Sequence, residues 1–207
     1  DIIIEKGKVK GVVTNRGKIN CKSLVSVVAG WSSEVCRKVG VKLPIVTHPL
    51  QALVTQGYKP WLHHVVVSGS LHIYLSQTDR GELVCGNGID TYPHYGMRST
   101  LGFLESYAAH VLELFPVLHN VAVQRQWAGL CDMTPDYSPI ISSIDEIEGF
   151  YVNGGWGTYG FKASPASGYN TAQMVAQGTP EMIQPFRYNR FMENRLGGEK
   201  AAASVGS

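Results

Sequence analysis

Residues 24–30, LVSVVAG, form a short and nearly continuous apolar run that ends in Ala-Gly. Such runs are typical of a strand that is buried on both faces, as in a parallel sheet. The next residues, 32–40, read SSEVCRKVG, in which Ser32 can cap a short helix and Gly40 can end it. We therefore predict a strand, a tight turn and the start of a helix. Ligands commonly bind at this carboxyl end of a buried strand.

The sequence on either side of this run predicts antiparallel structure. KVKGVVT (8–14) and KINCKS (18–23) flank the turn NRG and predict a hairpin. Over about residues 44–92, strand-like runs alternate with Gly, Pro and Asp, which predicts an antiparallel sheet. Residues 99–115 have apolar side chains at helical spacing, and Pro116 ends this pattern.

The last part of the chain returns to short apolar elements. We predict a strand at 121–131, short strands in SPIISS and GFYVN, and a final helix that Gly178 stops. The tail after about residue 191 has few apolar residues, so we expect it to fray. This order of elements predicts an α/β (α+β) fold in which two structural parts are interleaved along one chain and do not follow each other as separate domains.

Composition narrows the classes of partner. The 207 residues are 44% hydrophobic and 16% charged, with a formal net charge of +2, which argues against nucleic acid. No apolar run reaches about 18 residues, so we expect no membrane partner. The four cysteines lack a C-x-x-C pair, which favours free thiols in the cytoplasm and no metal site. The chain begins abruptly at Asp1, and we expect it to be part of a longer one.

Gly155, Gly157 and Gly160 spell G-x-G-x-x-G between a strand-like and a helix-like segment. A dinucleotide fold also needs a second strand and an acidic residue about 20 positions further on, and only Glu181 lies near that distance. Two other interpretations remain: a tight strand–helix turn with packed aromatic residues, or a turn whose backbone approaches a flat ligand. A helix N-terminus there would stabilise negative charge on that ligand. The similar stretch GNGIDT, 86–91, is interpreted as a turn.

Several separated segments together resemble one family. They are LVSVVAGWSSEV, HPLQALVT, SLHIYLSQTDRGELVCGNGID, WAGLCDMTPDYSPII, GGWGTYGFKASPASG and PFRYNRF, and they occur in the family's order. They resemble the D-amino-acid-oxidase-like, FAD-dependent amine oxidoreductases, and most of all the beta subunits of heterotetrameric sarcosine oxidases. The resemblance covers about residues 8–191 and corresponds to the C-terminal half of these flavoproteins.

This resemblance implies the C-terminal part of a glutathione-reductase-type FAD-binding domain together with an antiparallel substrate domain. The expected boundaries are 1–43 and 128–191 for the FAD-binding part, 44–127 for the substrate or interface domain, and 192–207 for the tail. The implied reaction oxidises a secondary or tertiary amino acid, such as sarcosine to glycine and formaldehyde with hydrogen peroxide. The implied partners are a small amino-acid substrate and the alpha, gamma and delta subunits of a hetero-oligomer.

The resemblance also assigns site residues. Lys162 matches a lysine that binds the substrate carboxylate, a role that suits a compact cation, and a solvated surface lysine is the alternative. Tyr74 loosely matches an aromatic residue over the flavin face, and a packed sheet tyrosine is an equal alternative. The residues that match FAD contacts are Ala29, Gly30, Trp31, Gly155, Trp156, Gly157, Thr158, Tyr159, Gly160 and Phe161.

The sequence also departs from the family pattern. Relatives with covalent FAD carry Cys six residues before the Pro of T-P-D, where this chain has Gly129, so we expect noncovalent FAD. The family's N-terminal half, which holds the dinucleotide fingerprint and the histidine that carries FMN, has no counterpart in these residues. FMN is therefore expected only in a full-length complex.

Two hypotheses stay open. The chain is half of a flavin amine oxidoreductase, or it is a binding or assembly module that keeps the fold without the catalysis. The residues do not choose among sarcosine, dimethylglycine and proline as substrate, and they do not identify the electron acceptor.

Overall fold

The computed structural model describes residues 1–196 and contains two compact units. Among the described residues, unit 1 comprises Asp1–Thr47 and 131–196, and unit 2 comprises His48–Leu130. Strands β5 (Val46–Gly57) and β9 (Val123–Met133) carry the chain from one unit into the other. Most of the predicted tail, residues 197–207, lies outside the described residues.

Unit 1 begins with the predicted hairpin. Strands β2 (Lys8–Thr14) and β3 (Gly17–Asn20) pair antiparallel, which confirms the prediction. A third strand, β1 (Ile2–Glu5), pairs with the other edge of β2. The pattern analysis missed this strand because the sequence IIIE is short and does not alternate between apolar and polar residues.

The second sheet of unit 1 contains the predicted parallel-type strand. Its order is β10 (Ile140–Ser143), β11 (Phe150–Gly154), β4 (Leu24–Ser26), and β11 runs parallel to β4. Strand β4 is shorter than predicted, because the chain turns into a 3-10 helix at Ala29–Trp31 and then into α1 (Ser32–Arg37).

One local prediction in this segment is wrong. Ser32 does not cap α1, because it is the first helical residue and Trp31 occupies the cap position. The Ser32 hydroxyl instead donates a hydrogen bond of 2.6 Å to the carbonyl oxygen of Ala29.

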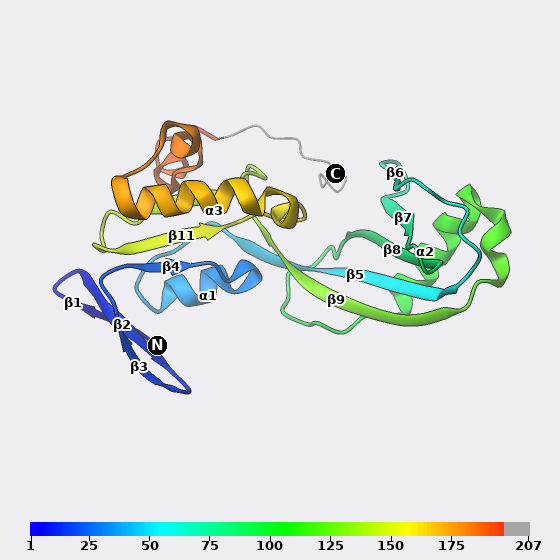
Figure 1. The fold of residues 1–207 in the computed structure, drawn as a ribbon, viewed down its shortest axis with the longest axis horizontal. Coiled ribbons are helices and arrows are strands. Elements are labelled where there is room, and N and C mark those ends of the chain that lie inside the picture. The colour runs from blue at the N-terminus through cyan, green and yellow to red at the C-terminus, as the bar shows by residue number, and fades with distance from the viewer. Residues whose placement is uncertain (197–207) are drawn as a thin grey trace. The chain divides into compact units, whose positions relative to one another are not determined.

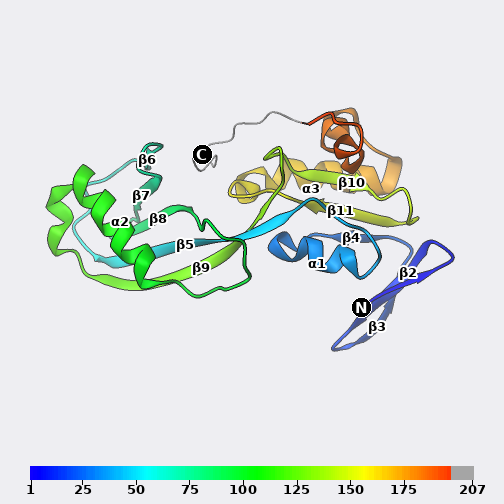
Figure 2. The ribbon, with the colours of Figure 1, turned by 180° about the vertical axis from the view of Figure 1, so that it is seen from behind.

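Helix α3 (Gly160–Gln177) packs against β10 and β11, as both views show (Figures 1 and 2). It ends at Gly178, which adopts a φ of +101°, as the sequence predicts. The core beneath it contains Met174 of the helix with Ile141 and Ile183, whereas Ile140 and Phe150 belong to a second cluster that includes Cys36 of α1.

Unit 2 contains the predicted antiparallel sheet. Its order is β6 (Val66–Ser68), β7 (Ile73–Gln77), β8 (Glu82–Ile89), β5 and β9. Helix α2 (Leu101–Leu114) covers one face of this sheet (Figure 2). The side chains that form this contact are Leu53, Ile73, Leu75, Leu83 and Cys85 of the strands with Phe103, Tyr107 and Val111 of the helix.

The turn predicted at GNGIDT is wrong, because β8 continues through this stretch to Ile89. Gly86 serves the sheet instead. It lies opposite Tyr74 on the neighbouring strand, and a Cβ atom on Gly86 would come within 2.3 Å of the Tyr74 ring. A glycine is therefore required here because an aromatic ring covers its backbone. No helix among residues 1–196 is both long and apolar enough to cross a membrane.

Candidate cofactor and substrate site

Two turns meet at the carboxyl ends of the parallel strands β4 and β11. Strand β4 leads into Ala29–Trp31, and β11 leads into the glycine turn 155–160. A Cβ atom placed on Gly154 would lie 2.9 Å from the Ser32 hydroxyl oxygen, so the two turns are in close contact. The carboxyl edge of parallel strands is the usual ligand site of open α/β sheets.

The first turn is held by two side-chain hydroxyls. Ala29 adopts a φ of +45°, which is uncommon for a residue with a side chain. Its carbonyl accepts the bond from Ser32 described above, and the buried Thr47 hydroxyl donates a bond of 2.6 Å to the carbonyl of Gly30. These bonds fix an unusual backbone conformation at the strand end, and Trp31 remains 44% exposed.

The glycine turn depends on close packing within its own unit. Gly155 and Gly157 have φ values of +76° and +56°. A Cβ atom on Gly155 would come within 2.6 Å of the Thr134 methyl group, and one on Gly160 within 2.9 Å of the Trp156 Cβ. Backbone conformation and internal contacts therefore both require glycine, in addition to any ligand.

The aromatic residues of the turn divide into two kinds. Trp156 donates its indole N–H to the Asn153 side-chain oxygen at 2.6 Å, and the Tyr159 hydroxyl donates to the Tyr137 carbonyl at 2.9 Å. Their rings meet edge to face at 5.8 Å. Phe161 is 96% exposed, and Thr158 is also exposed. The sequence prediction of packed aromatic residues therefore holds for two of these side chains, and Phe161 is available to a ligand or a further surface.

Asp132 lies beneath the turn, and the pattern analysis missed it. Its side chain is buried, and its two carboxyl oxygens accept the N–H groups of Gly155 at 2.5 Å and Gly157 at 3.1 Å. Burial raises the pKa of Asp132, and the backbone N–H groups act in the opposite direction. The available signal was an acidic residue in the otherwise apolar end of a strand, within LCDM.

Lys162 is exposed in the first turn of α3, and its ammonium group makes no hydrogen bond or ion pair with residues 1–196. A cation is disfavoured near a helix N-terminus, where the helix dipole is positive. Helix stability therefore does not explain this lysine, and its ammonium group is available to an anionic ligand.

Tyr74 belongs to unit 2, whereas the other predicted site residues belong to unit 1. Its neighbours in β7, Ile73 and Leu75, contact α2, so its side chain lies on the opposite face of the sheet. Its ring covers Gly86, which is a sufficient structural reason for an aromatic residue.

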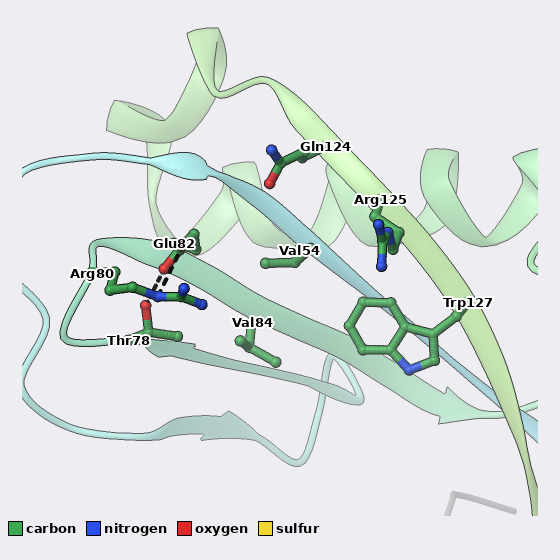
Figure 3. A pocket seen from close by; sticks show the side chains of 8 residues that line it. All are labelled: Val54, Thr78, Arg80, Glu82, Val84, Gln124, Arg125 and Trp127. Carbon is green, nitrogen blue, oxygen red and sulfur yellow. Dashed lines mark hydrogen bonds and ion pairs between the residues drawn. The ribbon is translucent and has the colours of Figure 1, made fainter.

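The same face carries a pocket of about 640 Å³ (Figure 3). Val54 and Val84 form its floor, and Trp127, which is 41% exposed, stands at one end. Arg80 is paired with Glu82, whereas Arg125 has no ion pair with the described residues. Thr78 and Gln124 complete the lining. This combination offers an aromatic surface and an available guanidinium group to a flat anionic molecule.

The chain is similar to known proteins over most of its length. The family model described as FAD dependent oxidoreductase matches residues 1–174. The beta subunit of sarcosine oxidase from Rhodobacter capsulatus is 43% identical over 97% of this chain and 48% of that protein. The corresponding subunit from Rhizobium meliloti is 44% identical over 95% of this chain and 47% of that protein. The chain thus spans about half the length of the curated relatives it matches.

Solved structures agree on the fold. L-proline dehydrogenase from P. horikoshii superposes with a TM-score of 0.88 at 30% identity, covering 94% of this chain and 54% of that one. Glycine oxidase from Bacillus cereus superposes with a TM-score of 0.79 at 22% identity, covering 91% of this chain and 51% of that one. The mixed α/β fold with antiparallel sheets expected from the sequence is therefore confirmed.

Proposed function

The chain belongs to the FAD dependent oxidoreductase family, and on this basis we propose that it forms the flavin-ring and substrate side of an amine-oxidising flavoenzyme. The observation that carries this proposal is the meeting of two turns with positive-φ residues, Ala29–Trp31 and 155–160, at the carboxyl ends of parallel strands. Unit 1 is then the FAD-binding part, and unit 2 the substrate or interface domain.

The residues of both turns suit a flat cofactor with a partly anionic ring. The N–H groups at the start of α3 have no acceptors within the helix and can donate to the ring. Ala29, Gly30 and Trp31 would contact the phosphate and ribityl side, and Gly155 to Phe161 the ring. Binding is noncovalent, because Gly129 occupies the position of the linking cysteine. Burial raises the pKa of the nearby Cys131 to about 11, which leaves little of the nucleophilic thiolate.

The proposed substrate is a secondary or tertiary amino acid, with sarcosine first because relatives at 43–44% identity carry that name. Bound FAD supplies the acceptor for a hydride equivalent from the N-methyl carbon. With oxygen as the final electron acceptor, sarcosine, water and oxygen would give glycine, formaldehyde and hydrogen peroxide. The Lys162 ammonium group would hold the substrate carboxylate, and Tyr74 is the aromatic residue of unit 2 that we propose for substrate binding.

The relatives are named as subunits, which supports a multi-subunit enzyme, and the partners that we propose are alpha, gamma and delta subunits. A second flavin, FMN, would suit such a complex. The four free cysteines support a cytoplasmic location.

The test uses the full-length gene product that contains this sequence. We expect a yellow protein whose FAD is released into the supernatant by acid precipitation, and whose flavin is reduced by sarcosine in stopped-flow experiments. Dimethylglycine and proline are the competing substrates. A colourless protein would instead support the non-catalytic module.

Lys162 is tested in the same assay. Lys162→Ala should weaken sarcosine binding or slow flavin reduction while FAD stays bound, and Lys162→Arg should retain part of the binding because it keeps the charge. Lys38→Ala removes a comparably exposed lysine and serves as the control. Equal rates and affinities in Lys162→Ala and Lys38→Ala would refute the assigned role.

A further inference from the structure

Asp132 is a buried acid that is held by the glycine turn alone. It is 3% exposed, and among residues 1–196 no lysine or arginine forms an ion pair with it. Its partners are the N–H groups of Gly155 and Gly157, and its own backbone carbonyl accepts a further bond of 3.1 Å from Gly157. The Asp132 side chain thus binds both glycines, and its backbone carbonyl binds Gly157 as well.

Such a group is costly for the fold. Burying a carboxyl group without a compensating cation is unfavourable, and it persists only where hydrogen bonds satisfy both oxygens. Bonds from N–H groups to a carboxylate are about twice as strong as bonds between neutral groups. The arrangement therefore fixes one conformation at two glycines, Gly155 and Gly157, whose backbone is otherwise free to adopt many.

The same carboxyl group also reaches the neighbourhood of the first turn. A Cβ atom on Gly154 would lie 3.5 Å from Oδ2 of Asp132, the oxygen that accepts from Gly155, and 2.9 Å from the Ser32 hydroxyl, which itself bonds to Ala29. The glycine at 154 lets the two turns and the acid come together. Asp132 thus lies where the two predicted cofactor segments converge.

We propose that Asp132 is a positioning residue for the flavin: it preorganises the turn 155–157 and adds a buried negative charge behind it. This rests on the proposed function. With the N–H groups of Gly155 and Gly157 directed inward, the N–H groups at the start of α3 are the donors that we assign to the ring. The carboxylate also opposes negative charge on a reduced flavin, so it lowers the midpoint potential.

The test compares Asp132→Asn with the wild type in the full-length flavoprotein. Asn keeps the shape but loses the charge and one acceptor oxygen. We expect FAD to dissociate about 10- to 100-fold more readily, which corresponds to the loss of one charge-assisted hydrogen bond. We also expect a shifted visible spectrum and a more positive midpoint potential. Glu181→Gln, which neutralises an exposed acid of unit 1, should change none of these.

A second measurement needs no variant. In wild-type protein stripped of FAD, the peptide that contains 150–160 should already be protected from hydrogen exchange, because Asp132 holds the turn before the cofactor binds. Protection that arises only when FAD is added would overturn the proposal, as would an unchanged potential and spectrum in Asp132→Asn. If the wild-type protein binds no FAD, the proposed function fails together with this inference. If it binds FAD and these tests are negative, only this inference fails.

Discussion

The ion pair between Asp136 and Arg190 is expected to hold the C-terminal segment of unit 1 in place. The Arg190 guanidinium bonds to the two Asp136 oxygens at 2.8 and 3.0 Å, and both side chains are almost completely buried, at 4% and 1% exposure. The same guanidinium donates to the carbonyls of Phe186, Arg187 and Ser138. It therefore joins the TPDYSP loop to the 3-10 helices at Glu181–Phe186 and Tyr188–Phe191.

Replacing Arg190 by Met leaves the Asp136 carboxylate buried without its cation. Removing one partner of a buried pair costs about 3–5 kcal/mol, which is a large part of the 5–15 kcal/mol that stabilises a typical protein. At about 2–4 °C per kcal/mol for a protein of this size, the melting temperature should fall by about 6–20 °C. The double variant Arg190→Met with Asp136→Asn should recover part of this loss, because it removes the unpaired charge.

The matched control is Arg37→Met. Arg37 also bonds to both oxygens of a carboxylate, that of Glu34, but its side chain is 69% exposed. Exposed pairs of this kind contribute about 0–1 kcal/mol. Urea midpoints of the three variants and the wild type, with limited proteolysis of residues 181–191, provide the measurement. Equal losses in Arg190→Met and Arg37→Met would refute the reasoning from burial.

Three further predictions concern single residues. Gly86→Ala should destabilise unit 2 by about 1–3 kcal/mol in urea unfolding, because its Cβ would overlap the Tyr74 ring, whereas Gly168→Ala in open space on α3 should stabilise by about 0.5–1 kcal/mol; similar effects at both sites would contradict this. Burial raises the pKa of Asp132, so protonation is easier in the folded than in the unfolded state, and wild-type stability relative to Asp132→Asn should fall as pH rises from about 4 through the raised pKa; a difference that stays constant or grows with pH would contradict this sign. Burial raises the pKa of Cys36 to about 11, so at about pH 8 a thiol reagent should modify the partly exposed Cys21 in the native protein and reach Cys36 only on unfolding, and fast native labelling of Cys36 in mass spectra would argue against the buried position.

Helices and strands with a clear hydrophobic period were predictable from the sequence. Contacts between residues that are far apart in the sequence were not. The run LVSVVAG indicates a parallel-type strand, and β4 pairs parallel with β11. The helix at 99–115 and the stop at Gly178 follow from spacing and from glycine. The length of β4 was overestimated, because hydrogen bonds from Ser32 and Thr47 stabilise a turn at Ala29. A hydrophobic sequence pattern does not reveal such side-chain-to-backbone hydrogen bonds.

Glycine was the least predictable residue. GNGIDT was interpreted as a turn because glycine is common in turns, yet Gly86 continues a strand since a ring from the next strand covers it. The sequence shows where a glycine lies, but it does not show which other residue packs against that glycine. The partner of Gly86 is 12 residues away, and that of Gly155, Thr134, is 21 residues away, so only the fold identifies them.

The direction of two N–H groups decides how the G-x-G-x-x-G pattern is used. In a phosphate-binding turn the glycine-rich backbone directs its N–H groups at the anion. Here the N–H groups of Gly155 and Gly157 point at the Asp132 carboxyl group, at 2.5 and 3.1 Å. A pyrophosphate would have to approach a buried acid and would lose two of its donors. The G-x-G-x-x-G motif therefore belongs to a turn whose first two glycines donate inward, to the protein itself. The N–H groups at the start of α3 remain available as donors to a ligand.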